Sequence, residues 1–432
     1  METRSQPVLE EIEKYFDRLW PICRSITGDG VRESLRILSE LVPFHIHEIP
    51  SGTPVFDWVI PREWNIRDAY IITPSGERTC DFKKNNLHVM NYSIPVNGEF
   101  TFDELRPHLF SVERLPDAIP YVTSYYKENW GFCISQHELE KLPKEGKYKA
   151  MIDSELKNGH LTYADLLLKG HSEKEIVFSS YICHPSMANN ELSGPLVMAF
   201  LYRMIEAMPE RKYSYRFILA PETIGAITYL ARHSETMKKN TLAGFVINCV
   251  GTNAPPVYKK SRRGNLIGDN AAIAVLKKSG MNFRVDEFEP IGSDERQYCS
   301  PAFDLPFGSL MRSKYSEYPE YHTSADNKNF ISFDAMLETA DLYFQIVKNI
   351  EREEILYNTV GTGEPNLGKR GLYPDLAGAL SVPEALLLRM RLLNFMDGTK
   401  SLSEFIAKYN YPEKLVFAEA EILKANSLLK PV

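Results

Sequence analysis

The stretch Ile176–Gly194 reads IVFSSYICHPSMANNELSG, and the rest of the chain is interpreted around it. It opens with an apolar run rich in β-branched and aromatic residues, which predicts a buried central strand. The run breaks at His184-Pro185 into a short polar turn, and a helix is expected to restart at Leu192. Ligands of open α/β sheets collect just beyond the carboxyl ends of the strands. We therefore expect a metal at His184, close to the Asn-Asn-Glu sequence of residues 189–191.

Size and charge narrow the class of protein. With 432 residues, of which 44% are hydrophobic, the chain can bury a large core in more than one domain. A formal net charge of -7 argues against nucleic acid as the main partner, because phosphate binding needs a basic face. No apolar run approaches the roughly 20 residues that cross a bilayer, and the charged N-terminus lacks a signal-peptide core. We expect a cytoplasmic protein whose six scattered cysteines are reduced.

Strand and helix patterns alternate from Tyr148 to Glu351, which predicts an α/β unit with a mostly parallel sheet flanked by helices. Its first strand is expected at Ala150–Asp153, and residues 1–54 join it through two amphipathic helices. Residues 55–142 contain short strand-like runs separated by Pro, Gly and Asn, which predicts a small inserted β-rich domain. The aromatic residues of this insert are interpreted as its core in preference to a ligand-stacking surface; they are Trp58, Trp64, Tyr121, Tyr125, Tyr126 and Trp130.

The C-terminal part has a different amino-acid composition. Residues 356–376 are rich in Gly, Pro and Asn and are expected to form a linker that follows the α/β unit (1–54 and 143–355). Residues 377–432 carry three short helical patterns and a tail that resembles the start of a wing, so we expect a winged-helix-like domain. Its charge is mixed and not basic, which favours packing or protein interaction over DNA reading.

Four polar stretches lie at expected strand ends of the α/β unit. Two of them carry a histidine, and together they supply several carboxylates at separate crossover points, which indicates a zinc hydrolase site with one or two metals. Glu222 follows an apolar strand directly and is suited to act as a general base. The stretches are His184 with residues 189–191, Pro221-Glu222-Thr223, Ser293-Asp294-Glu295, and Tyr321-His322-Thr323 with Asp326.

At this point the chain resembles a known family. It looks like the zinc aminopeptidase superfamily that includes bacterial leucyl aminopeptidase and glutaminyl cyclase. Within it, the chain resembles a bacterial branch with an inserted β domain and a C-terminal winged helix, often associated with polysaccharide biosynthesis. The resemblance is carried by IPSGTPVFDW (49–58), YICHPSMANNELSGP (181–195), PETIG (221–225), GSDERQYCSP (292–301) and EYPEYHTSADN (317–327).

The resemblance implies an altered metal site. His184 matches the first zinc histidine of the superfamily and His322 the last. The bridging aspartate falls on the amide Asn190, and the later aspartate ligand falls at or near Asn248, again an amide. A neutral amide is a poorer zinc ligand than a carboxylate, so a two-metal centre would be greatly weakened.

The paired glutamates of the superfamily fall on Glu222 and Thr223, so the base is kept while the adjacent metal ligand is lost. The expected mechanism uses one zinc per chain, held by His184, His322 and an oxygen from Asn190 or Glu191. An open coordination position would hold water, whose proton Glu222 would take.

Five further residues are candidates around this site, and three of them, Tyr321, Arg296 and Arg312, have a structural alternative. Tyr321 is expected to steady an oxyanion or simply to pack against His322. Asp294 or Glu295 would add a ligand or bind a substrate amine. Arg296 and Arg312 would grip a substrate carboxylate or form structural salt bridges.

Three functions are compatible with these residues. The first is a zinc hydrolase of aminopeptidase type that cleaves a peptide or amide bond in a small substrate. The second is a metal-poor relative that binds a ligand or partner in a biosynthetic pathway without hydrolysing it, which the amide substitutions favour. The third is a winged-helix regulator that senses a metabolite. A homo-oligomer remains open.

Overall fold

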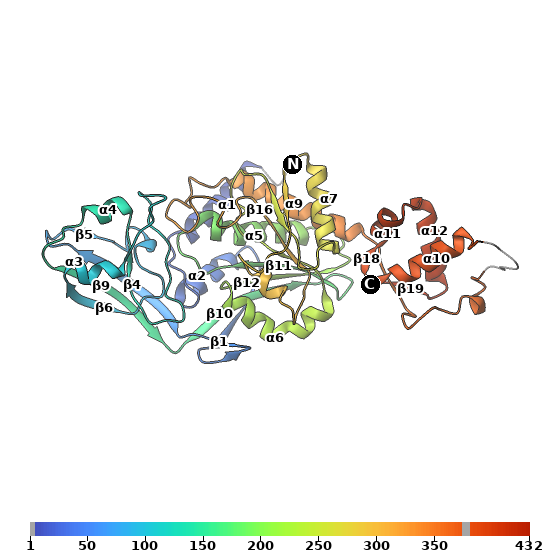
Figure 1. Cartoon of the computed structure of the whole chain (residues 1–432), viewed down its shortest axis with the longest axis horizontal. Coiled ribbons are helices and arrows are strands. Elements are labelled where there is room, and N and C mark those ends of the chain that lie inside the picture. Colours follow the sequence, from blue (N-terminus) through green and yellow to red (C-terminus); the bar gives the residue numbers. More distant parts are fainter. Residues whose placement is uncertain (1–4, 374–380) are drawn as a thin grey trace.

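The computed structural model describes residues 5–373 and 381–432. Figure 1 shows three bodies in a row: a β-rich insert at one end, a central sheet covered by helices, and a helical C-terminal domain at the other end. The sequence-based prediction of a mixed, mostly parallel α/β fold with an inserted β-rich region and a C-terminal winged helix is confirmed.

The central sheet has eight strands, and its middle strands are parallel. Because β12, β11, β13 and β16 run in one direction, their carboxyl ends meet at one edge of the sheet, where ligands of such sheets bind. The strands, in spatial order, are β1 (His45–Pro50), β10 (His160–Leu168), β12 (Ser214–Ala220), β11 (Glu175–Tyr181), β13 (Thr241–Val246), β16 (Phe307–Met311), β14 (Val257–Lys259) and β15 (Arg284–Asp286).

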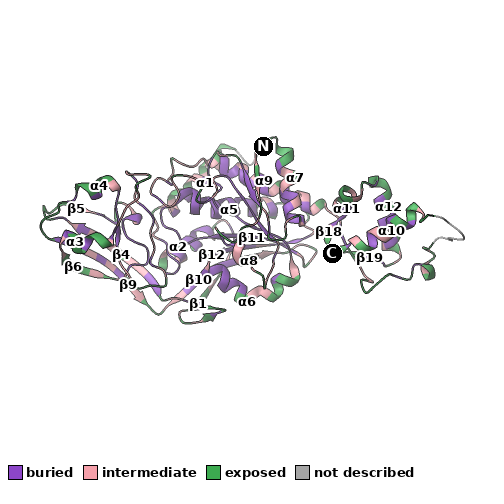
Figure 2. Ribbon diagram, viewed as in Figure 1, coloured by how far each residue is buried: buried purple, intermediate pink, exposed green. Residues whose placement is uncertain are grey.

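Strand β11 is buried on both faces, as its sequence predicts. Phe178 points into the core under α5 and stacks between Phe217 and Phe245 of the neighbouring strands, with ring centroids 5.5 and 5.7 Å away. Val177, one residue earlier, belongs to the core on the opposite face. Figure 2 shows this buried centre between exposed helix faces.

Helices cover both faces of the sheet. The first face carries most of them: α1 (Gln6–Leu19), α2 (Asp29–Leu38), α5 (Ser193–Glu206), α7 (Ile267–Ser279) and α9 (Phe333–Arg352). The second carries α6 (Ile224–Asn240) and the short α8 (Glu295–Tyr298). Helix α5 lies so close to the strands that a Cβ on Gly194 would meet the Ile247 carbonyl oxygen at 2.3 Å.

The insert is built on a four-stranded antiparallel sheet in the order β5 (Arg78–Thr79), β4 (Glu63–Ile72), β9 (Tyr148–Lys157) and β6 (Val96–Phe100). Strand β9 includes Ala150–Asp153, which was expected to open the α/β sheet; it pairs with β4 instead. The insert therefore continues to Lys157 in sequence, beyond the expected end at residue 142. Its shorter elements are β2 (Pro54–Val55), β3 (Trp58–Val59), η2 (Asn86–His88), α3 (Phe102–Leu105), η3 (Arg106–His108), β7 (Leu109–Phe110), β8 (Phe132–Cys133) and α4 (Gln136–Lys141).

A segment of the insert reaches back over the edge of the sheet. The backbone N–H of Tyr121 donates to the carbonyl of His322 at 2.8 Å, and the N–H of Ser324 donates to Ile119 at 2.8 Å. Pro120 and Thr323 form a β-bridge between these contacts. The insert therefore forms part of the wall above the strand ends.

The C-terminal domain begins earlier than expected. Strand β17 (Ile355–Asn358) lies at the end of the α/β unit and the start of the predicted linker, and it pairs with β18 (Asp397–Ser401) and β19 (Leu429–Pro431). The expected linker and domain boundary at residues 376 and 377 fall partly outside the described residues. The remaining elements are η5 (Gly368–Arg370), α10 (Glu384–Phe395), α11 (Leu402–Tyr409) and α12 (Glu413–Ala425).

Among the helices in residues 5–373 and 381–432, none has the length and apolarity needed to cross a membrane.

Candidate active site

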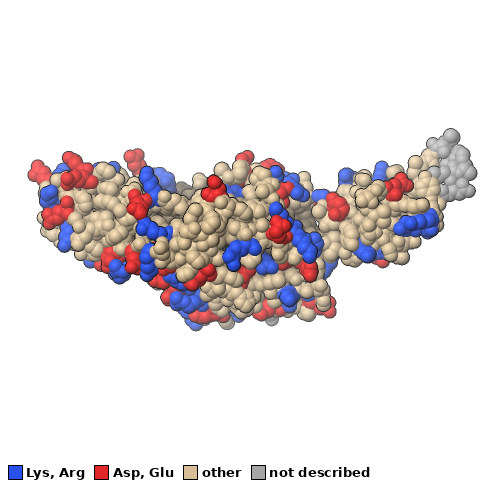
Figure 3. Space-filling view, turned by 90° about the horizontal axis from the view of Figure 1, so that it is seen from below, with Lys and Arg blue, Asp and Glu red and all other residues tan. Residues whose placement is uncertain are grey.

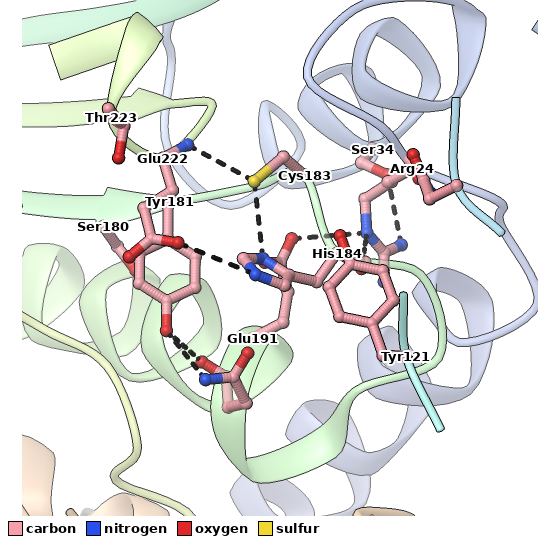
Figure 4. A network of polar contacts seen from close by, with 12 residues as sticks. Arg24, Ser34, Tyr121, Ser180, Tyr181, Cys183, His184, Glu191, Glu222 and Thr223 are labelled. Carbon is pink, nitrogen blue, oxygen red and sulfur yellow. Dashed lines mark hydrogen bonds and ion pairs between the residues drawn. The ribbon is translucent and has the colours of Figure 1, made fainter. Parts of the chain in front are cut away.

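The predicted site residues gather where β11 and β12 end. His184 follows β11, and Glu222 follows β12, the strand paired beside it. The Nε2 atom of His184 lies 3.7 Å from Oε2 of Glu222. Figure 4 shows these two side chains facing each other across the sheet edge.

The other ring nitrogen of His184 is bound from behind. Its Nδ1 lies 2.8 Å from Oε2 of Glu191, a fully buried carboxylate in the π-helical turn Ala188–Leu192. Burial lowers the pKa of His184, but the hydrogen bond and charge of Glu191 outweigh it and raise the pKa above its ordinary value. A π-turn often marks a functional position, and here it aims Glu191 at the imidazole. Because Nδ1 is engaged, Nε2 is the nitrogen turned toward Glu222.

A buried arginine supports this pair. Arg24, which follows α1, is fully buried, and its Nε donates to the carbonyl of His184 at 3.0 Å. The same Nε lies 3.4 Å from Oε1 of Glu191. Burial lowers the pKa of Arg24, while the charge of Glu191 opposes that effect. The arginine therefore fixes the backbone of one residue and the carboxylate of the other (Figure 4).

His322 arrives from a loop far along the chain. Its ring centroid lies 5.5 Å from that of His184, and its Nε2 is buried with no hydrogen-bond partner among the described residues. Burial lowers the pKa of His322 to about 3, and the charges of His184 and Arg114 add to that effect. The imidazole is therefore neutral near pH 7, with a free electron pair. The left-handed backbone at His322, with φ at 55°, turns the chain at this point.

Asn190 lies in the same π-helical turn as Glu191. Its Nδ2 donates to the Tyr181 hydroxyl at 3.2 Å, whereas its Oδ1 is buried and unpartnered within the described chain. Asp326 accepts the backbone N–H groups of Asn189 and Asn190 at 2.6 and 2.9 Å, which holds the turn. Burial raises the pKa of Asp326 to about 6, although these hydrogen bonds oppose the rise. Asn248, expected near a ligand position, is also buried, and neither of its amide atoms has a partner in the described part of the chain.

The corner beside Glu222 is formed by Thr223. Thr223 adopts a left-handed φ of 64°, which is strained for a β-branched residue. Its N–H donates to Asp294 at 2.7 Å, and its hydroxyl accepts from Nη2 of Arg296 at 2.8 Å. Burial raises the pKa of Glu222, and the charges of His184 and Arg296 oppose that rise.

A cavity of about 280 Å³ opens onto these side chains. Its polar wall includes His184, His322, Glu222 and Thr223, together with Cys183. Much of the remaining wall consists of Tyr121, Tyr125 and Tyr126 from the insert. These tyrosines were expected to form the core of the insert; in the structure all three line the cavity.

The donor set can be tested for its fit to a metal ion. A zinc ion bound through imidazole nitrogen at ~2.0–2.1 Å with tetrahedral angles brings two ring centroids to about 5 Å apart. The centroids of His184 and His322 are 5.5 Å apart. Two buried acceptors, His322 Nε2 and Asn190 Oδ1, lack a protein donor in the described residues. The centroid spacing and the two unpartnered atoms are compatible with a metal ion held between His184 and His322.

A second trio could also hold a metal. The ligand atoms of Cys183, His184 and Glu191 lie within 4.8 Å of one another. However, Nδ1 of His184 is already hydrogen-bonded to Glu191, and the Cys183 sulfur accepts the N–H of Glu222 at 3.3 Å. Burial raises the pKa of the Cys183 thiol well above its ordinary value, and the charges of Glu191 and Glu222 add to that effect. The ligand atoms of this trio already have protein partners, with Glu222 on Cys183 and Arg24 beside Glu191, which makes the cavity side the better metal position.

Other predicted site residues are not brought to the cavity. Arg312 donates to the Thr339 hydroxyl at 2.8 Å and pairs with Glu338, so α9 holds it. Glu295 is fully buried against Nζ of Lys259 at 2.7 Å. The ring of Tyr321 stacks on His322, with centroids 3.9 Å apart. Arg312 and Tyr321 thus make the structural contacts considered as alternatives for them, while Glu295 binds Lys259 where a metal or a substrate amine was expected.

The sequence pattern did not identify some residues of the site. Arg24 stands in an ordinary loop sequence, and Cys183 reads as the end of an apolar strand. The aromatic richness of the insert was the signal that pointed to Tyr121, Tyr125 and Tyr126. Only the contact between the insert and the loop at residues 318–326 assigns those rings to the cavity.

Comparisons with known proteins identify relatives over nearly the whole chain. The family model described as a domain of unknown function (DUF4910) matches residues 13–353, and a winged helix-turn-helix model matches residues 354–431. A Clostridium acetobutylicum protein is 43% identical over 422 residues, which cover 98% of this chain and 96% of the relative. Its name gives it provisionally as a polysaccharide biosynthesis protein with an aminopeptidase-like domain.

Solved structures show the same fold. A Clostridium acetobutylicum crystal structure, named provisionally as a peptidase, is 41% identical, has a TM-score of 0.80 and covers 99% of this chain and 97% of its own. The zinc aminopeptidase BSAP from Bacillus subtilis is 13% identical with a TM-score of 0.57, over 80% of this chain and 95% of that chain. An aminopeptidase from Aneurinibacillus sp. strain AM-1 is 15% identical with a TM-score of 0.51, over 80% and 94% of the two chains. The α/β unit therefore has the fold of zinc aminopeptidases.

Proposed function

We propose that this chain, which belongs to the DUF4910 family, is a zinc-dependent hydrolase that cleaves a peptide or amide bond in a small substrate. The aminopeptidase-like fold supports the reaction class. The name of the Clostridium relative supports a place in polysaccharide biosynthesis.

One observation carries the proposal. The imidazoles of His184 and His322 lie with centroids 5.5 Å apart at the edge of the sheet, and Nε2 of His322 has no partner among the described residues. A buried polar atom without a partner is costly, because its desolvation is not repaid. Such an atom beside a second imidazole and a carboxylate is well explained by a shared cation.

His184, His322 and Asn190 would hold the metal, and Glu191 and Arg24 orient the first of them. When bound, zinc lowers the pKa of a bound water and polarises the carbonyl of the substrate. Glu222 removes the proton from the water that attacks the carbonyl carbon. It then returns that proton to the amide nitrogen as the C–N bond breaks, so the products are an acid and an amine.

A non-hydrolytic binding protein is the second candidate function. The observation that favours it is the set of neutral side chains, Asn190, Thr223 and Asn248, where the aminopeptidase resemblance implies carboxylates. A weakened metal site would leave a cavity that binds a small molecule without cleaving it.

The test combines metal content and activity on protein purified without chelators. We expect about one zinc per chain by mass spectrometry, and hydrolysis of at least one member of a panel of small amides. Glu222→Gln keeps the shape of the side chain and should lower kcat/KM by roughly 100-fold or more with zinc retained. Protein without zinc and without hydrolysis in zinc-supplemented buffer would favour the binding protein.

A further inference from the structure

The charge of the cavity wall determines which substrates it can accept. A free ammonium group next to the scissile amide needs an unpaired carboxylate to receive it, because an uncompensated buried charge is costly. Glu222 is the only acidic side chain among the described residues that line the cavity. The proposed mechanism already uses Glu222 to take the proton of the attacking water. Among the described residues, the cavity wall therefore has no carboxylate besides Glu222 that could pair with a substrate ammonium group.

The two carboxylates expected to bind a substrate amine are engaged elsewhere. Oδ1 of Asp294 accepts the backbone N–H of Thr223 at 2.7 Å, and the residue is 2% exposed. Oε1 of Glu295 binds Nζ of Lys259 at 2.7 Å and accepts the Tyr315 hydroxyl at 3.3 Å. Neither carboxylate lines the cavity. Both serve as internal partners of the protein.

The corner next to Glu222 places a cationic group beside Thr223, opposite the carboxylate of Asp294. Thr223 lines the cavity, and its hydroxyl accepts a hydrogen bond from Nη2 of Arg296 at 2.8 Å. Arg296 does not itself line the cavity and acts there through Thr223. Its positive charge disfavours an ammonium group beside Thr223 and favours a carbonyl or carboxylate oxygen there.

Aromatic rings supply much of the remaining wall. Tyr121, Tyr125 and Tyr126 line the cavity, and the Trp58 ring packs edge-on against Tyr126 with centroids 5.2 Å apart. Tyr126 is 48% exposed and Trp58 is 36% exposed, so both rings reach solvent. Ring faces bordered by hydroxyl groups offer apolar contact and hydrogen bonds together. The flat face of a sugar ring, rimmed by hydroxyls of its own, is complementary to such a wall.

We propose that the cavity takes an N-acyl amide whose neighbouring group is neutral or anionic, such as an acylated amino sugar, and rejects substrates with a free α-ammonium group. This inference rests on the hydrolase proposed above for its chemistry. The substrate would be N-acylated where an aminopeptidase substrate carries a free amine.

The first test compares two p-nitroanilides on the zinc-loaded full-length protein. Alanine p-nitroanilide carries an ammonium group that propionic acid p-nitroanilide lacks, and the two are otherwise alike. We expect kcat/KM to favour the propionyl compound by at least tenfold. A preference for the alanyl compound, or equal rates on the two, would overturn the inference.

The second test reverses the charge of residue 296, which contacts Thr223 at the cavity. Arg296→Glu should shift the ratio of the two kcat/KM values by at least tenfold toward the alanyl compound, whereas Arg296→Lys should keep the wild-type preference. A ratio that is unchanged in Arg296→Glu would contradict the assignment of the corner to Arg296.

A third measurement separates this inference from the hydrolase proposal. If no amide is cleaved, the hydrolase proposal fails. In that case the selection against an ammonium group is tested by binding alone, with N-acetylglucosamine and protonated glucosamine compared by calorimetry. Binding of the acetylated sugar that is at least tenfold tighter supports the inference. Equal binding, no binding of either sugar, or tighter binding of glucosamine overturns it.

Discussion

At the scale of single residues, the site is organised by how each ring nitrogen of His184 is used. Glu191 engages Nδ1 at 2.8 Å, and this leaves Nε2 for the cavity. Partners of this kind, behind a metal ligand, fix the orientation of the ring and raise its basicity. Arg24 in turn holds Glu191 from the far side.

We predict that Glu191→Gln weakens zinc binding by about 10- to 100-fold, because an amide holds the imidazole less firmly than a carboxylate does. The dissociation constant is measured by competition with a zinc chelator, and circular dichroism checks the fold. Glu235→Gln, on the exposed surface of α6, is the matched control and should bind zinc as the wild type does. Unchanged zinc affinity in Glu191→Gln would show that Glu191 does not support a ligand.

The sequence predicted part of the residue-level site. His184, Glu222 and His322 follow recognisable strand-end patterns, and the structure brings them together. Arg24 could not be predicted, because its contact with Glu191 joins distant segments and leaves no local pattern. Arg296 was predicted to bind a carboxylate, and its position beside Thr223 keeps that role as a proposal.

At the scale of elements, the sequence patterns predicted strands and helices better than they predicted which strands pair with one another. The run around Ala150–Asp153 is a strand, as predicted, but it belongs to β9 in the sheet of the insert. An alternating pattern reports that one face is buried and does not specify which sheet buries it. The pairing of β17 with β18 and β19 was also missed. Because β17 directly follows the long helix α9, its residues were assigned to the end of the α/β unit and the start of the linker.

A buried carboxylate contributes to the junction between the insert and the α/β unit. Glu63, at the start of β4, binds Nη1 of Arg32 in α2 at 3.0 Å and accepts the N–H of His160 at 3.0 Å. Burial raises the pKa of Glu63, but these hydrogen bonds outweigh it and lower the pKa below its ordinary value of 4.5. A depressed carboxyl pKa adds stability above the unfolded pKa, and that stability is lost as the pH falls through the folded pKa.

We predict that Glu63→Gln lowers the free energy of unfolding at pH 7 by about 1–3 kcal/mol, the range for a charge-assisted hydrogen bond. The difference from wild type should shrink as the pH falls below 4.5, because the unfolded carboxylate is protonated first, and it is lost once the pH also passes the lowered pKa of the native carboxylate. Urea unfolding at several pH values measures both effects. Glu155→Gln, whose partner Lys157 is exposed, is the control with an expected change under about 1 kcal/mol. A difference that stays constant from pH 7 to pH 3 would argue against this role.

At the scale of the whole molecule, the three bodies contribute differently to the site. The sheet supplies the strand ends, and the insert supplies the tyrosine wall. The C-terminal domain contacts the α/β unit on α7, where Nδ2 of Asn270 donates to Glu404 at 2.6 Å. Figure 3 shows Lys and Arg interspersed with Asp and Glu along the visible face of the molecule.

We predict that the winged helix does not bind duplex DNA at physiological salt. Helix α12 contains three glutamates and two lysines in its sequence EKLVFAEAEILKA, so it lacks the positive charge that phosphate contact requires. An electrophoretic mobility shift with mixed-sequence DNA should show no retention at micromolar protein. Specific, salt-sensitive retention would instead favour the metabolite-sensing regulator.

X-ray absorption fine structure at the zinc edge of the metal-loaded protein shows most directly whether His184 and His322 share one cation. Two imidazoles that share one cation predict a first shell of nitrogen and oxygen at ~2.0–2.1 Å, with outer-shell scattering from two histidine rings. His322→Ala should remove one of the two ring signals. A sulfur neighbour at ~2.3 Å would assign the metal to Cys183 instead, and together with a single ring signal it would contradict the convergence of His184 and His322 on a common ion.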